Sequence, residues 1–374
     1  MKKKLQSVLL IVLLLGMVVP VCAIDFKFGK NKAIIDGIAY QVNIKKETAT
    51  VVKGNEPYIG DIVIPEKITL DSITCYVEEI GAGAFSGSSG MTSIALPSII
   101  TKIGAEAFKG CSSLTSVTIP AKITEIASGM FEDCSSLTEV IFTANIKKMG
   151  SGVFRGCSSL EEYTIPATIK EVPNAMFKGC TNLRSITLPN GLTGIGNNAF
   201  AECRSLENID IPRGVKSIDR DAFNGCSSLD SIDVPNSVAY LGTSVFEDCS
   251  NLRVANFPSG IKRVPSGFFK NCASLESISI PNSVKDIGSD AFYGCASITS
   301  IVIPVAVKSI GGDAFDKCAG LVTVKVMGAI PPKISGSTFA KSTLMEGTLK
   351  VRSSAFIAFN QDKQWKKFAF IQPE

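Results

Sequence analysis

Apolar and polar residues alternate over short stretches of this chain, and a similar stretch returns with a constant 23-residue period. In one copy Leu114, Val117 and Ile119 are apolar and the residues between them are polar, a period of two that predicts a strand with one buried face. Pro120 follows directly and ends the strand, because proline has no N–H to give to a ladder. Nine copies end in this way, at Pro97, Pro120, Pro166, Pro189, Pro212, Pro235, Pro258, Pro281 and Pro304.

The other half of the unit predicts a second strand and a turn. Ile123 and Ile126 alternate with polar residues, which indicates a shorter strand on the opposite side of the coil. Gly104 turns the chain, and Ala107–Phe108 are expected in a short helical or 3₁₀ turn that ends at Gly110.

Eleven copies of the unit follow one another without insertion or deletion. A fixed period of about 20–50 residues is the mark of a solenoid, so the chain is predicted to form a repeat solenoid of eleven 23-residue coils over residues 80–327. Coils about 4.8 Å apart would give an inner sheet roughly 50 Å long. Each copy carries one phenylalanine of a predicted buried column: Phe85, Phe108, Phe131, Phe154, Phe177, Phe200, Phe223, Phe246, Phe269, Phe292 and Phe315.

Both ends of such a stack need a cap, because a terminal coil has a neighbour on one side only. Residues 24–79 break the register and alternate between apolar segments and glycine or charged turns, which predicts a β-rich N-terminal cap. Residues 328–374 are predicted to form the C-terminal cap. Its polar helix, from Ser353 through Trp365 to Phe368, would place the only tryptophan over the last phenylalanine.

Residues 1–23 predict a signal peptide. Three lysines precede an apolar run from Val8 to Val19, and Val21-Cys22-Ala23 resembles a cleavage site. The run is too short to cross a bilayer, so the protein is expected to be exported to the cell surface, the periplasm or the medium, with no transmembrane segment. Lipidation at Cys22 is the less favoured alternative, because Pro20-Val21 does not fit a lipobox. Removing the signal lowers the formal charge from +4 to about +1, which gives no reason to expect nucleic acid as a partner.

The string from Ile103 to Pro120, I-G-A-E-A-F-K-G-C-S-S-L-T-S-V-T-I-P, resembles the BspA-type leucine-rich repeat of exported proteins from host-associated anaerobic bacteria. The resemblance covers about residues 80–326. It implies a right-handed leucine-rich-repeat superhelix, capped at both ends. It also implies a surface or secreted protein that binds host matrix proteins or other bacteria, with no catalytic residues to carry over.

Ten of the twelve cysteines repeat at the same step: Cys111, Cys134, Cys157, Cys180, Cys203, Cys226, Cys249, Cys272, Cys295 and Cys318. One thiol per coil forms a straight column, whereas zinc needs four converging ligands, and parallel side chains strain a disulfide. We therefore expect buried, reduced thiols, and neither a metal nor a cofactor. Residues 194–199 fit a dinucleotide fingerprint only by accident of register, because no βαβ unit surrounds them.

Histidine is absent, which removes the commonest general base and argues against an enzyme. Candidate binding residues come instead from the outward columns of the longer strands, on the face expected to be concave. Four carboxylates fall on two adjacent coils there, Glu207 and Asp210 on one and Asp230 and Asp233 on the next. Charged neighbours in the first of these columns are Glu161, Arg184 and Arg253.

Crowded carboxylates with no histidine nearby suggest a cationic ligand, such as a basic protein segment or Ca²⁺; the alternative is a solvated acidic face. We predict a non-catalytic binding or adhesion protein that recognises a protein through the concave face. The alternatives are a structural cell-envelope protein and a carbohydrate-binding accessory, the latter disfavoured because the concave columns lack exposed aromatic residues.

A column of lysines lies just before each coil boundary: Lys147, Lys170, Lys216, Lys262, Lys285 and Lys308. Its spacing is regular enough to attract a polyanion such as a sulfated glycan, although the repeat alone explains this regularity.

Overall fold

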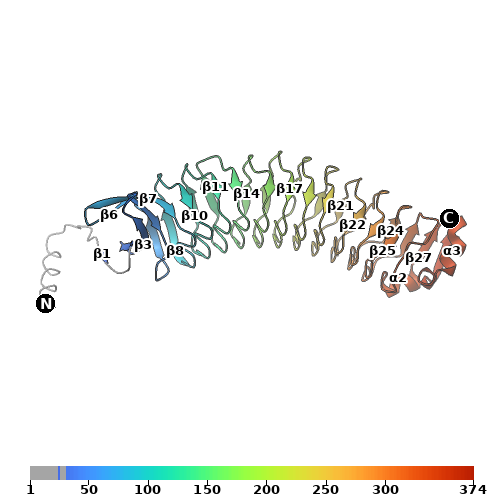
Figure 1. Ribbon diagram of the computed structural model, residues 1–374. Coiled ribbons are helices and arrows are strands. Elements are labelled where there is room, and N and C mark those ends of the chain that lie inside the picture. The colour runs from blue at the N-terminus through green and yellow to red at the C-terminus, as the bar shows by residue number, and fades with distance from the viewer. Residues whose placement is uncertain (1–23, 26–30) are drawn as a thin grey trace.

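The computed structural model describes residues 24–25 and 31–374 and shows an elongated, gently arched solenoid (Figure 1). The coils follow one another along the arch in sequence order, from the blue N-terminal end to the red C-terminal end. The predicted signal peptide, with Cys22, lies outside the described residues.

Longer strands form one side of each coil and pair in parallel with the next coil. Val117 faces Val140 and Ile119 faces Phe142, so each residue lies opposite its equivalent in the next repeat and the predicted leucine-rich-repeat solenoid is confirmed. These strands are β5 (Ile59–Val63), β8 (Gly90–Ala95), β10 (Ser116–Ile119), β12 (Glu139–Phe142), β14 (Glu162–Thr164), β16 (Ser185–Thr187), β19 (Ser231–Asp233), β21 (Val254–Asn256), β24 (Ser300–Ile303) and β26 (Thr323–Val326).

The sheet of longer strands is interrupted, in contrast to the continuous sheet expected from the repeat. Its ladders are β5–β8, β10–β12, β14–β16, β19–β21 and a four-stranded ladder that begins with β24 and β26. Residues 206–211, which lie between β16 and β19 in sequence, form no strand. The hydrogen bonds of the turn segments continue across these interruptions, as from Phe131 N to Val153 O.

Shorter strands of two residues form the opposite side of the coils, as predicted. Pro173 and Pro265 explain two of the gaps in this second sheet. In most other coils the residue at this position donates its N–H to the preceding coil, as Gly196 does to the Val172 carbonyl, and proline has no N–H. The strands are β9 (Lys102–Ile103), β11 (Glu125–Ile126), β13 (Lys148–Met149), β15 (Glu171–Val172), β17 (Gly194–Ile195), β18 (Ser217–Ile218), β20 (Tyr240–Leu241), β22 (Arg263–Val264), β23 (Asp286–Ile287) and β25 (Ser309–Ile310).

The segment around each phenylalanine forms hydrogen-bonded turns and not a helix. The N–H of Phe108 donates to Met130 O of the next coil at 3.0 Å, while the N–H of Cys111 donates back to Phe108 O at 3.1 Å. Glu106 and Gly110 have φ of 56° and 71°, in the left-handed region. A helix cannot continue through this segment because alternate N–H groups are bonded to the neighbouring coil.

The phenylalanines stack into a spine along the core. Phe85 and Phe108 are typical, with ring centroids 5.5 Å apart and planes 7° apart. The spine extends beyond the eleven predicted members: Tyr58 lies 5.0 Å before Phe85, and Phe339 stacks 5.4 Å beyond Phe315. Each ring is therefore buried largely against rings of neighbouring coils.

At the N-terminal end the short-strand sheet continues into an antiparallel meander. Here β4 pairs in parallel with β7, and β7 pairs in parallel with β9. The remaining pairs are antiparallel, and β6 pairs with β7 at the edge. The strands are β1 (Ile24–Asp25), β2 (Lys32–Ile35), β3 (Ile38–Asn43), β4 (Thr48–Val51), β6 (Lys67–Leu70) and β7 (Ile73–Ile80).

At the C-terminal end β26 is followed in the same parallel ladder by two more strands, and short helices cover the core. Trp365 is fully buried, lies 5.5 Å from Phe339 and donates its indole N–H to Pro332 O at 2.8 Å. The ring that Trp365 covers is thus Phe339, one ring beyond Phe315, the last member of the predicted column. The elements are α2 (Lys341–Glu346), β27 (Thr348–Val351), η1 (Ser353–Ala355), α3 (Phe356–Gln361), η2 (Trp365–Lys367) and β28 (Phe370–Pro373).

The ten repeat cysteines form the predicted buried column, and each thiol has a hydrogen-bond partner. Cys134 Sγ donates to Phe108 O of the preceding coil at 3.0 Å, the same carbonyl that accepts the Cys111 N–H. Burial raises the pKa of Cys226 to about 12 and that of Cys203 well above its usual value. All eleven cysteines within residues 31–374 are free and buried.

These thiols are expected to be unreactive in the native protein, because the thiolate is the nucleophile and neither ionisation nor reagent access is available in the column. Titration with a thiol reagent should modify the ten cysteines only after a denaturant is added. Rapid modification of several native thiols, or disulfides between adjacent coils found by mass spectrometry, would contradict a buried reduced column.

Candidate functional site

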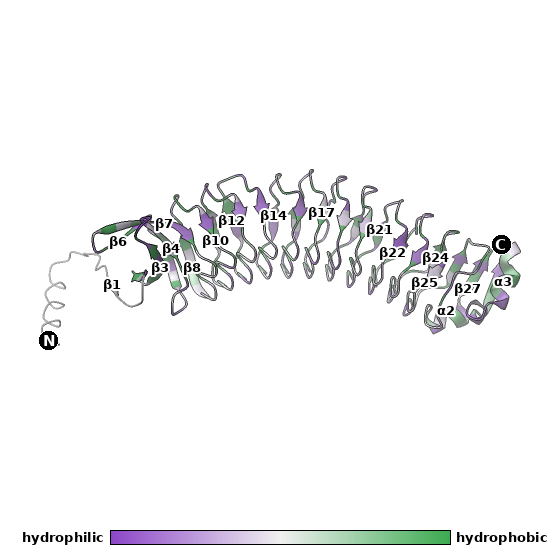
Figure 2. Ribbon diagram, in the orientation of Figure 1, coloured by the Kyte–Doolittle hydropathy of each residue, from purple (hydrophilic) through white to green (hydrophobic). Residues whose placement is uncertain are grey.

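Outward side chains of the longer strands form a polar surface that we call the long-strand face. It consists of the side chains at the Thr115 and Thr118 positions and their equivalents in each coil. Figure 2 shows hydrophilic residues along these strands, for example on β10 and β14. In Figure 1 the strands run across the solenoid axis within the plane of the arch, so the assignment of this face to the concave side stays a prediction.

Backbone hydrogen bonds bring three of the candidate residues into one column. Asp230 N donates to Glu207 O at 3.1 Å, and Arg253 N donates to Asp230 O at 2.8 Å. All three side chains are exposed. The repeat spacing therefore places the carboxylates of Glu207 and Asp230 on neighbouring coils.

The two arginines beside the acidic residues differ in their contacts. Arg253 Nε donates to Glu276 Oε1 at 3.0 Å, on the coil away from the cluster, and this bond together with the charges of Glu276 and Asp230 raises the pKa of the guanidinium. Arg184 N donates to Glu161 O at 2.8 Å. No ion pair between Arg184 and Glu161 occurs in the described structure.

Asp210 and Asp233 occupy the second outward column. Asp233 lies on β19 in register with Asn256 of β21, and Asp210 lies in the strandless segment 206–211. Both are exposed. Glu207, Asp210, Asp230 and Asp233 form what we call the acidic cluster; within residues 31–374 none of its carboxylates takes part in an ion pair.

Glu276 was not among the candidate residues. The signal that could have identified it is its position one repeat after Arg253, in the same column. Because Glu276 holds the guanidinium of Arg253, this arginine offsets the acidic cluster less than its position in the column suggests.

A groove of about 460 Å³ opens on the same face where the ladder breaks between β12 and β14. Val140, Phe142 and Tyr163 line it and are partly buried, and Glu139 and Glu162 stand at its rim. The groove thus combines partly buried apolar residues with further carboxylates, two coils from Glu207.

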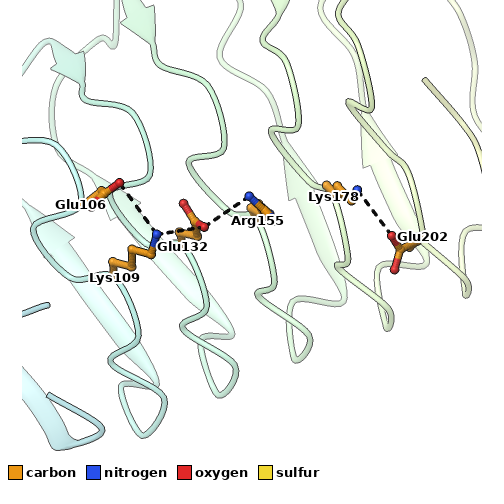
Figure 3. A network of polar contacts seen from close by, with 6 residues as sticks. All are labelled: Glu106, Lys109, Glu132, Arg155, Lys178 and Glu202. Atoms are coloured by element: carbon orange, nitrogen blue, oxygen red, sulfur yellow. Dashed lines mark ion pairs between the residues drawn. The ribbon is translucent and has the colours of Figure 1, made fainter. Parts of the chain in front are cut away.

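The turn edge of the coils, by contrast, carries paired charges. Lys109 Nζ lies 3.2 Å from Glu132 Oε1, and Arg155 Nη1 lies 3.5 Å from the same oxygen (Figure 3). Lys178 pairs with Glu202 and Lys270 with Glu247. These pairs neutralise part of the charge at this edge, whereas within the described residues no carboxylate of the acidic cluster is paired.

The described residues hold no group of three or more histidine, cysteine or carboxylate side chains placed to bind a metal ion. Among the described residues, no helix has the length and apolar character that spanning a bilayer requires. What the long-strand face offers chemically is a set of exposed charges and one groove of mixed polar and apolar lining, which suit recognition of another molecule.

Solved structures of leucine-rich-repeat proteins resemble this one. A leucine-rich cell-surface protein of Faecalibacterium prausnitzii is 28% identical with a TM-score of 0.55, over 80% of this chain and 96% of that one. A leucine-rich repeat protein of Bacteroides ovatus is 24% identical with a TM-score of 0.64, over 93% and 100%. The pneumococcal vaccine antigen PcpA is 19% identical with a TM-score of 0.54, over 93% and 100%. The last two show the fold alone.

No curated protein matches the chain by sequence. The family comparison, however, covers most of it. The BspA type leucine-rich repeat region matches residues 65–184, 153–276 and 253–364, which include all eleven 23-residue coils. The chain therefore belongs to the BspA-type leucine-rich-repeat family.

Proposed function

We propose that this protein is an exported, non-catalytic surface protein that binds a basic segment of a protein ligand at the acidic cluster. The observation that carries the proposal is the exposed set of four carboxylates on two adjacent coils, none of which is in an ion pair within the described residues. The surface location is supported by the family and by the name of the Faecalibacterium relative.

Electrostatic complementarity explains why such a cluster suits a cationic partner. Like charges on neighbouring coils repel one another, so a bound lysine or arginine segment would relieve repulsion and also gain attraction. Complementary charge chiefly raises the association rate and the specificity of binding. The interaction is therefore expected to weaken as salt rises, since exposed charges are screened within about 8–10 Å at physiological salt.

The groove between β12 and β14 gives the same ligand a partly apolar anchor point. Binding energy in protein interfaces is concentrated in a few residues that fill pockets. A side chain seated against Val140, Phe142 and Tyr163 would fix the register of a segment whose basic residues reach the acidic cluster. This arrangement favours an extended peptide or loop over a small molecule.

The test is capture of matrix proteins and bacterial surface proteins by the purified protein, compared with the variant Glu207→Gln, Asp210→Asn, Asp230→Asn, Asp233→Asn. We expect the variant to lose at least tenfold in affinity for the captured ligand while its thermal midpoint changes little, because exposed charges contribute little to stability.

A matched control removes four carboxylates from the turn edge: Asp221→Asn, Asp248→Asn, Asp290→Asn and Asp313→Asn. These residues have φ of 56° to 61°, where asparagine is also tolerated. The control should bind as the unaltered protein does. Equal loss in both variants would assign the effect to net charge, and unchanged binding by the cluster variant would show that the acidic cluster is only a solvated face.

A further inference from the structure

A second charged surface lies at the junction between the proline-ended loops and the short strands, and it is basic. Backbone hydrogen bonds of 2.7 to 2.9 Å link its lysines in series: Lys285 N to Lys262 O, Lys308 N to Lys285 O, and Lys333 N to Lys308 O. All four lysines are exposed. With coils about 4.8 Å apart, they form a row of cations about 15 Å long. We call this row, together with Arg263, the basic edge.

The cationic side chains of the basic edge are not paired with carboxylates in the described structure, in contrast to the lysines of the turn edge. Within residues 31–374 no ion pair involves any of its five cationic residues, whereas Lys109, Lys178 and Lys270 at the turn edge are all paired. The acidic residue nearest to it in sequence and register is Asp286, opposite Arg263, and Asp286 accepts a hydrogen bond of 2.6 Å from Ser309. The single carboxylate of Asp286 offsets only part of the charge of the five cations, so the basic edge keeps a net positive charge.

A groove with one aromatic side chain, Tyr240, in its wall lies at the Lys262 end of the basic edge. It has a volume of about 410 Å³ and is lined by Tyr240, Lys262, Arg263 and Pro265, among others. Tyr240 is 57% exposed, and a Cβ added at Gly260, which also lines the groove, would meet no atom within 4 Å. The groove lies where Pro265 interrupts the short-strand sheet between β20 and β22, so the fold leaves open space beside an exposed ring.

We propose that the basic edge and Tyr240 bind a linear anionic polysaccharide, with its acidic groups on the lysine row and one sugar ring against the face of Tyr240. A polymer of regularly spaced anions matches cations that recur at every coil, and neutralising a lysine row by one polyanion releases counterions. A ring that is apolar on its faces and polar at its hydroxyl suits a sugar. Single-stranded nucleic acid fits less well, since it is held by a series of aromatic platforms, and this row has one.

This surface is separate from the long-strand face, so its test does not depend on the protein ligand proposed above. Heparin and inorganic polyphosphate serve as probes, with neutral dextran and single-stranded DNA for comparison. The variant Lys262→Gln, Lys285→Gln, Lys308→Gln should bind heparin at least tenfold more weakly and show a shallower dependence of log Kd on log salt. The matched control Lys109→Gln, Lys178→Gln, Lys270→Gln carries the same change in charge at the turn edge and should bind heparin within about twofold of the unaltered protein.

Tyr240→Ala separates sugar recognition from charge alone. We expect this variant to bind heparin about fivefold more weakly and polyphosphate equally well, while Tyr76→Ala, at another exposed tyrosine, changes neither. Equal losses in the two lysine variants would overturn the proposal, because the effect would then follow net charge. Tighter binding of DNA than of heparin, or an unchanged heparin affinity in Tyr240→Ala, would overturn the assignment to a polysaccharide.

Discussion

Replacing Phe200 with alanine is expected to lower the free energy of unfolding by about 3–5 kcal/mol. Phe200 is fully buried and stacks between Phe177, at 5.5 Å, and Phe223, at 5.3 Å. Truncation would remove buried apolar area and leave a cavity that two stiff coils cannot fill. Urea unfolding followed by circular dichroism measures the change.

Phe370→Ala is the control for this experiment, because Phe370 is 53% exposed, and it should cost less than about 1 kcal/mol. Phe85→Ala should cost as much as Phe200→Ala, since Phe85 has rings on both sides, Tyr58 and Phe108. A loss at Phe200 no larger than that at Phe370 would show that the spine is not what joins the coils.

A steep loss of stability above pH 8.5 is the second large effect that we expect. Nine of the ten column cysteines have a raised pKa, mostly because burial disfavours the thiolate. In the unfolded chain a thiol ionises near pH 8.5, whereas Cys226 and Cys318 in the folded protein do so only at about 12. Between these values the unfolded state binds fewer protons, so the free energy of unfolding falls as pH rises.

The size of the effect follows from the number of thiols. Each contributes up to about 1.4 kcal/mol per pH unit above 8.5, and stabilities are typically about 5–15 kcal/mol, so the protein should unfold near pH 10. Thermal midpoints measured from pH 7 to 10.5 give the profile. The double variant Cys203→Ala, Cys226→Ala should show a shallower decline, and a flat profile up to pH 10.5 would contradict buried, protonated thiols.

Features that keep the 23-residue step were predictable from the sequence. Cys111, Phe108 and Val117 and their equivalents fall in columns because nothing is inserted between Ile80 and Lys325. Phe339 was missed because the interval from Phe315 to Phe339 is slightly longer than the repeat, so a search at a fixed step passes over it. Tyr58 was missed for the same reason, since the interval from Tyr58 to Phe85 is longer still.

The sequence also predicted which residues of the acidic cluster and its charged neighbours share a column. It did not predict the direction in which their side chains point. Arg253 has a carboxylate one coil on either side, Asp230 and Glu276, and the sequence cannot tell which one receives the guanidinium. The structure places Arg253 on Glu276. The groove beside Tyr240 was not anticipated because it depends on Pro265, whose missing N–H interrupts a sheet that the repeat pattern predicts to be continuous.

The most direct test of the proposed binding site is the affinity of the captured protein ligand as a function of salt, for the unaltered protein and for the acidic-cluster variant. We predict that log Kd of the unaltered protein rises steeply with log salt, and that the variant binds more weakly with a nearly flat dependence. The same affinity and the same salt dependence in both proteins would contradict binding at Glu207, Asp210, Asp230 and Asp233.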